Sequence, residues 1–192
     1  MGSDALALVE LTSVARGYRV VDALVKKAPV KVLEANLVEP GVFLILFTGG
    51  VAEVEEAFNE AVEVAEDSLR DQMFLPLVHE AVVPALGGHQ DCQEVDALGI
   101  LEGRLISSTL QACDRALKDS RVALAGIRIT PALGGKAFFV VHGPQHDVEA
   151  AISAATGILM ERGSLVRSEL IARPHEDFLR LVLRPAPFQV ES

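Results

Sequence analysis

Residues 96–102 of this 192-residue chain read DALGILE, and they repeat the opening of the chain, where residues 4–10 read DALALVE. The two stretches lie 92 positions apart, which is about half of the chain. A repeat of that length is too long for a solenoid unit and has the size of a small domain. We therefore predict two tandem domains, residues 1–88 and 96–192, joined by a polar linker at residues 89–95 that follows a glycine pair.

Each repeat continues with the same order of predicted elements. Short apolar runs predict three strands in each repeat, because buried strands are typically apolar runs of four to eight residues. The predicted strands cover residues 5–9, 30–35 and 42–47 in the first repeat and residues 97–101, 122–127 and 137–141 in the second. The segment after the first strand of each repeat has the period of an amphipathic helix.

This first helix has the same apolar spacing in both repeats. Apolar residues at i, i+4, i+7 and i+11 predict one apolar stripe along the helix. They are Val14, Tyr18, Val21 and Val25 in the first repeat and Ile106, Leu110, Cys113 and Leu117 in the second. We therefore interpret Cys113 as a small buried hydrophobic residue rather than as a nucleophile. Each helix ends in a lysine, Lys26 or Lys118, and these again lie 92 positions apart.

A second helix is predicted after the third strand, from residue 51 to about 65 and from about 147 to 162. Each repeat then closes with a short strand and a small helix, around residues 75–80 and 171–176. The order β-α-β-β-α-β, followed by a small terminal helix, predicts an α+β fold of the ferredoxin-like, split βαβ type. In that fold an antiparallel sheet carries both main helices on one face.

The two repeats differ in length at one loop. The glycines that end the third strands, Gly49 and Gly143, lie 94 positions apart, whereas the first strands lie 92 apart. The loop at residues 130–135 is therefore two residues longer than its counterpart at residues 38–41. Loops tolerate insertions and often carry function.

Composition excludes several classes of protein. The net charge is −10, Trp is absent and there is one Tyr, so the basic stripe and stacking rings of nucleic-acid-binding proteins are missing. No apolar run reaches the roughly 18 residues that span a bilayer, and no signal peptide precedes the first strand. Two cysteines at unrelated spacing indicate neither a zinc site nor a disulfide framework. We expect a cytoplasmic protein.

Catalytic and metal-binding motifs are also missing from the sequence. The pairs His79-Glu80 and His175-Glu176 do not form HExxH, because Val83 and Leu179 occupy the position of the second histidine. His142 and His146 are separated by a proline and do not share a helix face. No GxSxG, P-loop or GxGxxG occurs. We therefore predict no catalytic residues and no metal site.

These motifs and their order resemble bacterial microcompartment shell proteins of the tandem-domain type, which form trimers. Single-domain members of that family read ALGMIE in the first strand, DAMVKAA at the end of the first helix and IPRPH at the close. Here ALGILE at residues 97–102 matches the opening, and DALVKKA at residues 22–28 matches the helix end. DRALK at residues 114–118 is a looser match, and IARPH at residues 171–175 matches the close. The order of elements is the unpermuted one.

The resemblance implies that two BMC domains in each of three chains form a pseudohexameric disc, or tile, with a central pore. The loops at the pore are then formed by Val38, Glu39, Pro40 and Gly41 and by Thr130, Pro131, Ala132, Leu133, Gly134 and Gly135. Contacts at the tile edge are implied for Lys26, Lys118, Arg173, His79 and His175. The first repeat departs from the closing motif, reading PLVH at residues 76–79 in place of PRPH.

The expected function is that of a structural shell protein, without enzymatic activity, in a bacterial microcompartment of the cytoplasm. The implied partners are two further copies of the chain, other shell proteins at the tile edges and small metabolites that cross the pore. Some tandem members hold an iron–sulfur cluster through a pore cysteine, but neither loop here contains one, so no cofactor is expected. Three Glu39 carboxylates at one opening would disfavour anions. The alternative is a trimeric small-molecule sensor with a similar fold.

Overall fold

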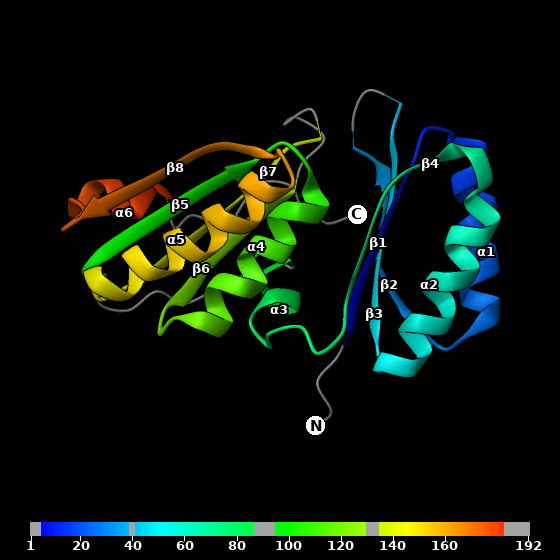
Figure 1. Cartoon of the computed structure of the whole chain (residues 1–192), viewed down its shortest axis with the longest axis horizontal. Coiled ribbons are helices and arrows are strands. Elements are labelled where there is room, and N and C mark those ends of the chain that lie inside the picture. Colours follow the sequence, from blue (N-terminus) through cyan, green and yellow to red (C-terminus); the bar gives the residue numbers. More distant parts are fainter. Residues whose placement is uncertain (1–4, 39–40, 87–94, 130–134, 183–192) are drawn as a thin grey trace. The chain divides into compact units, whose positions relative to one another are not determined.

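The computed structural model describes residues 5–38, 41–86, 95–129 and 135–182, and Figure 1 shows its elements. In the first repeat these are β1 (Ala5–Leu11), α1 (Val14–Lys27), β2 (Lys31–Leu37), β3 (Phe43–Gly49), α2 (Val51–Ala65), the short 3₁₀ helix η1 (Glu66–Ser68), β4 (Leu69–Leu75) and α3 (Val82–Leu86). In the second repeat they are β5 (Ala97–Gly103), α4 (Ile106–Asp119), β6 (Ala123–Ile129), β7 (Ala137–Gly143), α5 (Gln145–Glu161), β8 (Leu165–Ala172) and α6 (Glu176–Val182).

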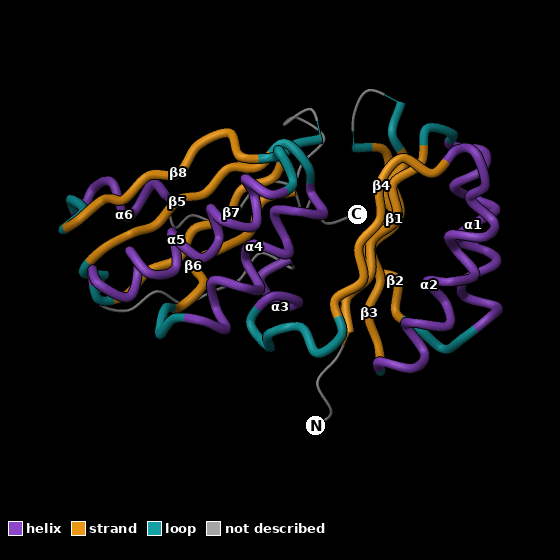
Figure 2. Tube along the Cα trace, in the orientation of Figure 1, coloured by secondary structure: helices purple, strands orange, loops and turns teal. Residues whose placement is uncertain are grey.

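Each repeat forms one four-stranded antiparallel sheet. The strand orders are β2-β3-β1-β4 and β6-β7-β5-β8, so the first strand of each repeat is central and the second and fourth strands are the edges. The two main helices of each repeat pack against each other and lie on one face of their own sheet (Figures 1 and 2). The predicted split βαβ fold is therefore confirmed in both repeats.

The described chain divides into two compact units. The first comprises the described residues up to Glu80 together with Gly135, and the second comprises the other described residues from Ala81 onward. The helix α3, which the sequence predicts at the close of the first repeat, packs against β6 of the second unit. Its Val82 and Ala85 side chains are buried. Most of the predicted linker, like residues 87 and 88 at the predicted domain limit, lies outside the described residues.

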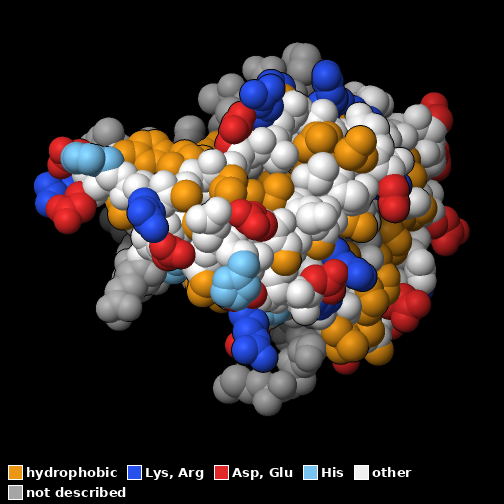
Figure 3. All heavy atoms as spheres, turned by 60° about the vertical axis from the view of Figure 1, so that its left-hand side comes forward, with side chains coloured by type: hydrophobic (Ala, Val, Ile, Leu, Met, Phe, Trp, Pro, Cys, Tyr) orange, Lys and Arg blue, Asp and Glu red, His pale blue; other side chains and the backbone are white. Residues whose placement is uncertain are grey.

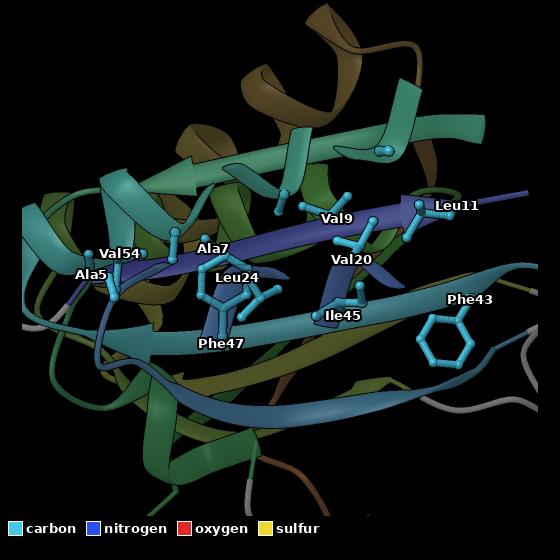
Figure 4. Packing of buried hydrophobic residues seen from close by; sticks show 14 residues of the cluster. Ala5, Ala7, Val9, Leu11, Val20, Leu24, Phe43, Ile45, Phe47 and Val54 are labelled. Carbon is cyan, nitrogen blue, oxygen red and sulfur yellow. The ribbon is translucent and has the colours of Figure 1, made fainter. Parts of the chain in front are cut away.

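The core of the first unit lies between its sheet and its two helices (Figure 4). Its members alternate along the strands, as the period of two requires, and recur at helical spacing on α1 and α2. They are Ala5, Ala7, Val9, Leu11, Val20, Leu24, Ala28, Phe43, Ile45, Phe47, Val54, Ala57, Ala61 and Ala65. Gly17 belongs to this contact, because a Cβ atom at that position would lie 2.3 Å from the ring of Phe43.

The predicted apolar stripe of α1 does not point into this core as a whole. Val14 and Val21 pack against the core cluster, but 67% of Tyr18 and 45% of Val25 are exposed. Gly17, Val20 and Leu24 form the buried face instead, because glycine at residue 17 lets the helix approach Phe43 closely. In α4 the predicted stripe is buried as expected, and Cys113 is fully buried.

The closing strands are longer and begin earlier than the sequence predicts. β4 ends at Leu75, and β8 ends at Ala172, so most of each closing motif is a turn. The turn is the same in both repeats, because Leu77 and Arg173 both adopt left-handed backbone angles, with φ of 57° and 48°. Polar residues along β4, LRDQMFL, hide its strand pattern in the sequence.

In the part of the chain that the structure describes, no helix combines the length and the apolar character needed to cross a membrane.

Candidate functional site

The loop between the second and third strands is where the two repeats change register. β2 and β6 correspond at a shift of 92 residues, whereas β3 and β7 correspond at a shift of 94. Gly41 and Gly135 both have a φ of +77°, so the two loops end with the same left-handed glycine. The two extra residues therefore lie between Ile129 and Gly135, as the sequence predicts.

Three of the predicted pore residues can be placed. Val38 is buried, and its backbone N–H donates to the carbonyl of Val42 at 3.0 Å, which closes the base of the first loop. Gly41 and Gly135 supply the left-handed turn that leads into β3 and β7. Outside the described residues lie Glu39, Pro40, Thr130, Pro131, Ala132, Leu133 and Gly134.

The two predicted edge lysines occupy the last turn of equivalent helices. Lys26 Nζ donates to Asp22 Oδ2 at 2.6 Å, and Lys118 Nζ donates to Asp114 Oδ2 at 2.7 Å. Each pair spans one helical turn, at i and i+4, which favours the ion pair and the helix together. The Lys26 side chain is 72% exposed and the Lys118 side chain 39%. Both ammonium groups are thus held in place at the surface of their own unit.

A shallow hollow lies beside each of these lysines. The first has a volume of about 460 Å³ and is lined by Arg19, Asp22, Ala23, Lys26, Lys27, Glu60 and Val64. The second has a volume of about 430 Å³ and is lined by Lys118, Asp119, Ser120, Arg121, His146, Asp147 and Ala150. Both linings mix acids and bases, so each hollow suits polar or charged contacts rather than an apolar ligand.

The closing motif places its residues differently in the two repeats. Arg173 is exposed, and its backbone N–H donates to the carbonyl of Asp96 at 2.8 Å. His175 is exposed, and its Nδ1 accepts from the N–H of Asp177 at 3.2 Å, which caps the start of α6. Leu77, the counterpart of Arg173, is 56% exposed, and His79 is half-buried. The left-handed turn is shared, but the exposed side chain at its apex is basic in one repeat and apolar in the other.

One carboxyl group that the sequence did not single out is strongly perturbed. Glu10, at the end of β1, is 2% exposed, and its Oε1 has no hydrogen-bond partner among the described residues. It lies opposite Asp71 on β4, and Arg70 Nη1 is 4.0 Å from its Oε2. Burial, and then the charge of Asp71, raise the pKa of Glu10 from 4.5 to about 7, while Arg70 opposes the shift.

The counterpart of Glu10 in the second repeat has favourable charges around it. Glu102 lies opposite Arg167 on β8, and its Oε1 accepts from Lys136 Nζ at 3.2 Å. A strand that ends in Glu is visible twice in the sequence. The residue that faces this Glu depends on the register of the closing strand, which the sequence did not predict.

The other titratable groups with a perturbed pKa do not form a common site among the described residues. Burial, and then the neighbouring Asp114, raise the pKa of the Cys113 thiol well above its usual range, as expected for a packed residue. Burial lowers the pKa of His142 below its usual range. Within the described ranges, no three His, Cys, Asp or Glu side chains are grouped closely enough to hold a metal ion.

Comparison with known proteins identifies the relatives of this chain. The family model described as BMC domain matches residues 5–78 and again residues 97–174. The bacterial microcompartment shell protein PduT of Citrobacter freundii is 36% identical over 178 residues, which cover 93% of this chain and 97% of that protein. The shell protein EutM of Salmonella typhimurium strain LT2 is 32% identical over 83 residues, 43% of this chain and 84% of that protein.

A solved structure resembles the whole fold. The crystal structure of a microcompartment protein from Desulfitobacterium hafniense DCB is 36% identical to this chain and has a TM-score of 0.87. The match covers 93% of this chain and 99% of that one. The similarity therefore extends over both repeats and their order.

Proposed function

The chain belongs to the BMC-domain family and is a structural shell protein of a bacterial microcompartment, and we propose that it works there as a homotrimeric tile with a central pore. The observation that carries this proposal is the tandem repeat. Two BMC domains in one chain supply two of the six positions of a pseudohexameric disc, so three chains complete it. Closed rotational symmetry of this kind is the usual state of soluble homo-oligomers.

The surface of α1 supports association of the chain with itself. Tyr18 and Val25 are 67% and 45% exposed, whereas their counterparts on α4, Leu110 and Leu117, are 0% and 5% exposed. Figure 3 brings forward the side of the second repeat, and there too hydrophobic side chains, in orange, lie between charged ones. Tyr18 and Val25 are thus exposed although the equivalent residues of the other repeat are buried. Such exposed apolar groups indicate a surface that a second copy covers.

We assign the pore to the two loops that differ in length. In a three-fold ring, three loops with Glu39 alternate with three apolar loops that are two residues longer. A ring of carboxylates disfavours anions and leaves neutral or cationic metabolites to pass. Glu39→Gln is expected to increase the permeation of a small anion through shells that contain this tile, with little change for a neutral solute of similar size. Equal effects on both solutes would remove Glu39 from the selectivity of the pore.

We assign the tile edge to Lys26, Lys118 and Arg173, with His79 and His175 beside it. Both lysines are held by an acid one turn earlier, and a hollow with mixed charges lies next to each. Such a surface suits polar contacts with other shell proteins, which are the partners that this proposal names. It assigns no catalytic residue to the chain.

Electron microscopy and light scattering of the purified chain test the proposal together. The chain is expected to have the mass of a trimer and to form extended sheets or tubes as its concentration is raised. Lys26→Ala combined with Lys118→Ala is expected to abolish the sheets and leave the trimer. Arg115→Ala is the matched control, because it removes an exposed base from α4 that pairs with Asp119 within its own helix.

Two results would contradict the proposal. A chain that stays monomeric at all concentrations would exclude the ring. A trimer that never forms sheets, and instead gains thermal stability with a nucleotide or small metabolite, would indicate a sensor with the same fold.

A further inference from the structure

The small helix that ends the first repeat does not pack against the strands of that repeat. α3 packs against β6, the edge strand of the second unit, with Cα atoms of the two elements within 8 Å of each other. Val82 and Ala85 are buried there. The same unit buries Leu124 and Ile127 of β6, which are 2% and 4% exposed. A closing helix of this protein thus covers the edge strand of the repeat that follows it in the chain.

The second repeat ends in a helix of the same kind. The left-handed turn at Leu77 recurs at Arg173, 96 positions later, so the chain leaves the sheet of each repeat through the same turn. At that shift the apolar residues of α3 correspond to apolar residues of α6. Val82, Val83, Ala85 and Leu86 correspond to Phe178, Leu179, Leu181 and Val182. The exposed Pro84 corresponds to Arg180, which is also exposed.

α6 lacks a comparable strand to cover. Among the described elements none packs against α6 as β6 packs against α3, and Figure 1 draws α6 at the end of β8. A helix of seven residues is not stable by itself in water and depends on packing of its apolar face. Phe178 and Leu179 of α6 are half-buried, so part of each side chain is left for a partner outside the described part of one chain.

The strand that corresponds to β6 is β2, and it is open. Five of its seven residues are exposed, whereas β6 exposes one. Leu37 is 45% exposed, and Ala35, the counterpart of the buried Ile127, is exposed as well. In the described chain β2 packs closely against β3 alone.

The charges on the two open elements also correspond. β2 carries Lys31 and Glu34 where β6 has Ala123 and Gly126. α6 carries Asp177 and Arg180 where the first repeat has Ala81 and Pro84, while its Glu176 corresponds to Glu80. Strand and helix thus each carry charges of both signs, which allows opposite charges to meet across a contact between them.

From these relations we infer that α6 of one chain docks on β2 of a second copy, as α3 covers β6 within the chain. The contact repeats around a ring, because each chain offers one free helix and one free strand. It rests on the proposed assembly of three copies and adds to it the segment that links them. In this arrangement α6 near the end of one chain covers β2 of the next chain.

Cross-linking between single-cysteine chains tests this contact. In a background with Cys92→Ser and Cys113→Ala, one chain carries Leu33→Cys on β2 and a differently tagged chain carries Leu179→Cys on α6. The two are co-expressed and treated with a short bismaleimide. The matched control is one chain with Val83→Cys and Ala125→Cys, the equivalent positions on α3 and β6, which should link within the chain.

The mixture is expected to give at least tenfold more covalent dimer than either chain alone, and one chain with both Leu33→Cys and Leu179→Cys is expected to give covalent trimers. An internally linked monomer from that double variant would show that α6 folds back on its own strand and would overturn the inference. So would a trimer by light scattering that forms no cross-link while the control does. That last result would contradict the docking of α6 on β2 but leave the proposed trimeric tile intact. A monomeric mass by light scattering would contradict both proposals.

Discussion

Glu10 and Glu102 occupy the same place at the end of the central strand in the two repeats, but opposite charges face them. Glu10 lies across from Asp71, is buried, and has a pKa raised to about 7. Glu102 lies across from Arg167 and pairs with Lys136 at 3.2 Å. The first arrangement penalises ionisation of the Glu10 carboxylate, whereas in the second an ammonium group lies within hydrogen-bond distance of the Glu102 carboxylate. The same backbone position thus carries a glutamate with an acidic neighbour in one repeat and a glutamate with basic neighbours in the other.

The packing beneath these residues shows the same kind of exchange. In the first unit Leu11 and Phe43 are paired neighbours on the sheet, and Gly17 on α1 leaves room for the phenylalanine ring. Their counterparts are Gly103, Ala137 and Thr109, so in the second repeat the side chains on the sheet are smaller and the one on the helix is larger. Thr109 fills the space next to Gly103, where an added Cβ would lie 2.1 Å from its hydroxyl. The two repeats therefore fill this contact between sheet and helix from different elements, and each glycine lies where the facing side chain needs its space.

The largest effect is expected when one residue of this contact is replaced by its counterpart and the other residue is left unchanged. Gly17→Thr gives the first unit the helix residue of the second but leaves Phe43, whose ring lies 2.3 Å from the new Cβ. Overpacking of this kind costs about 3 kcal/mol of stability. Urea denaturation followed by circular dichroism measures the loss.

Completing the exchange with Phe43→Ala tests whether the two positions act as a pair. Phe43→Ala alone is expected to cost about 3–4 kcal/mol by leaving a cavity. Gly17→Thr with Phe43→Ala should cost less than the sum of the single changes, by about 2 kcal/mol. Strict additivity of the two costs would show that the residues are independent and that the comparison with Thr109 and Ala137 has no energetic content.

The next effect concerns the unfavourable carboxylate. The pKa of Glu10 is raised in the folded chain, so folding takes up a proton, and the free energy of unfolding falls as the pH rises from about 4.5 to about 7. Glu10→Gln removes this dependence. The variant is expected to be more stable than the parent chain above pH 7, by about 2 kcal/mol, and to lose the advantage near pH 4.5. Unfolding curves across this range measure the difference.

Glu102→Gln is the matched control for that change. It removes a partly exposed ion pair with Lys136, whose contribution is about 0.5 kcal/mol, and its sign is destabilising. Stability curves of the Glu10→Gln variant and the parent chain that run parallel from pH 4.5 to 8 would contradict the role assigned to Glu10.

The sequence predicts the backbone of this protein better than its contacts. The 92-residue repeat, the change to 94 at one loop and the order β-α-β-β-α-β follow from apolar period and spacing, and the structure confirms each. The prediction that the apolar stripe of α1 is its buried face was wrong. Gly17, which has no hydrophobic side chain, lies on the face that packs against the core. Small residues allow close approach without appearing in an apolar pattern.

The candidate site was predicted in part for a related reason. Lys26 and Lys118 lie in the last turns of regular helices, as their spacing predicts, and their role at a tile edge stays a prediction. Glu10 was missed, because its pKa depends on what lies opposite it across two strands. β4 itself was hidden by its polar residues, so neither Asp71 nor Arg70 was available as a partner in the sequence.

A smaller effect is expected at the apex of the closing turn. Arg173→Leu gives the second repeat the residue of the first, and the left-handed angle of Leu77 shows that leucine is compatible with this backbone. Loss of charged hydrogen bonds at the proposed tile edge costs about 1.5 kcal/mol, or roughly a tenfold higher concentration for sheet formation. Leu77→Ala is expected to change that concentration less than about twofold. Light scattering and electron microscopy give the threshold, and equal shifts for the two variants would show that the edges do not differ at this position.

The smallest effect tests a feature that the two repeats share. Gly41 and Gly135 both have a φ of +77°, and a Cβ added to either would meet no heavy atom within 4 Å. Alanine at either position is therefore destabilising only because of the left-handed backbone angle, by about 1 kcal/mol. Gly41→Ala and Gly135→Ala should lower the free energy of unfolding by the same amount, within about 0.3 kcal/mol. A clearly larger loss for Gly135→Ala would mean that the two inserted residues strain the end of their loop, and that the longer loop is not simply the shorter one with residues added.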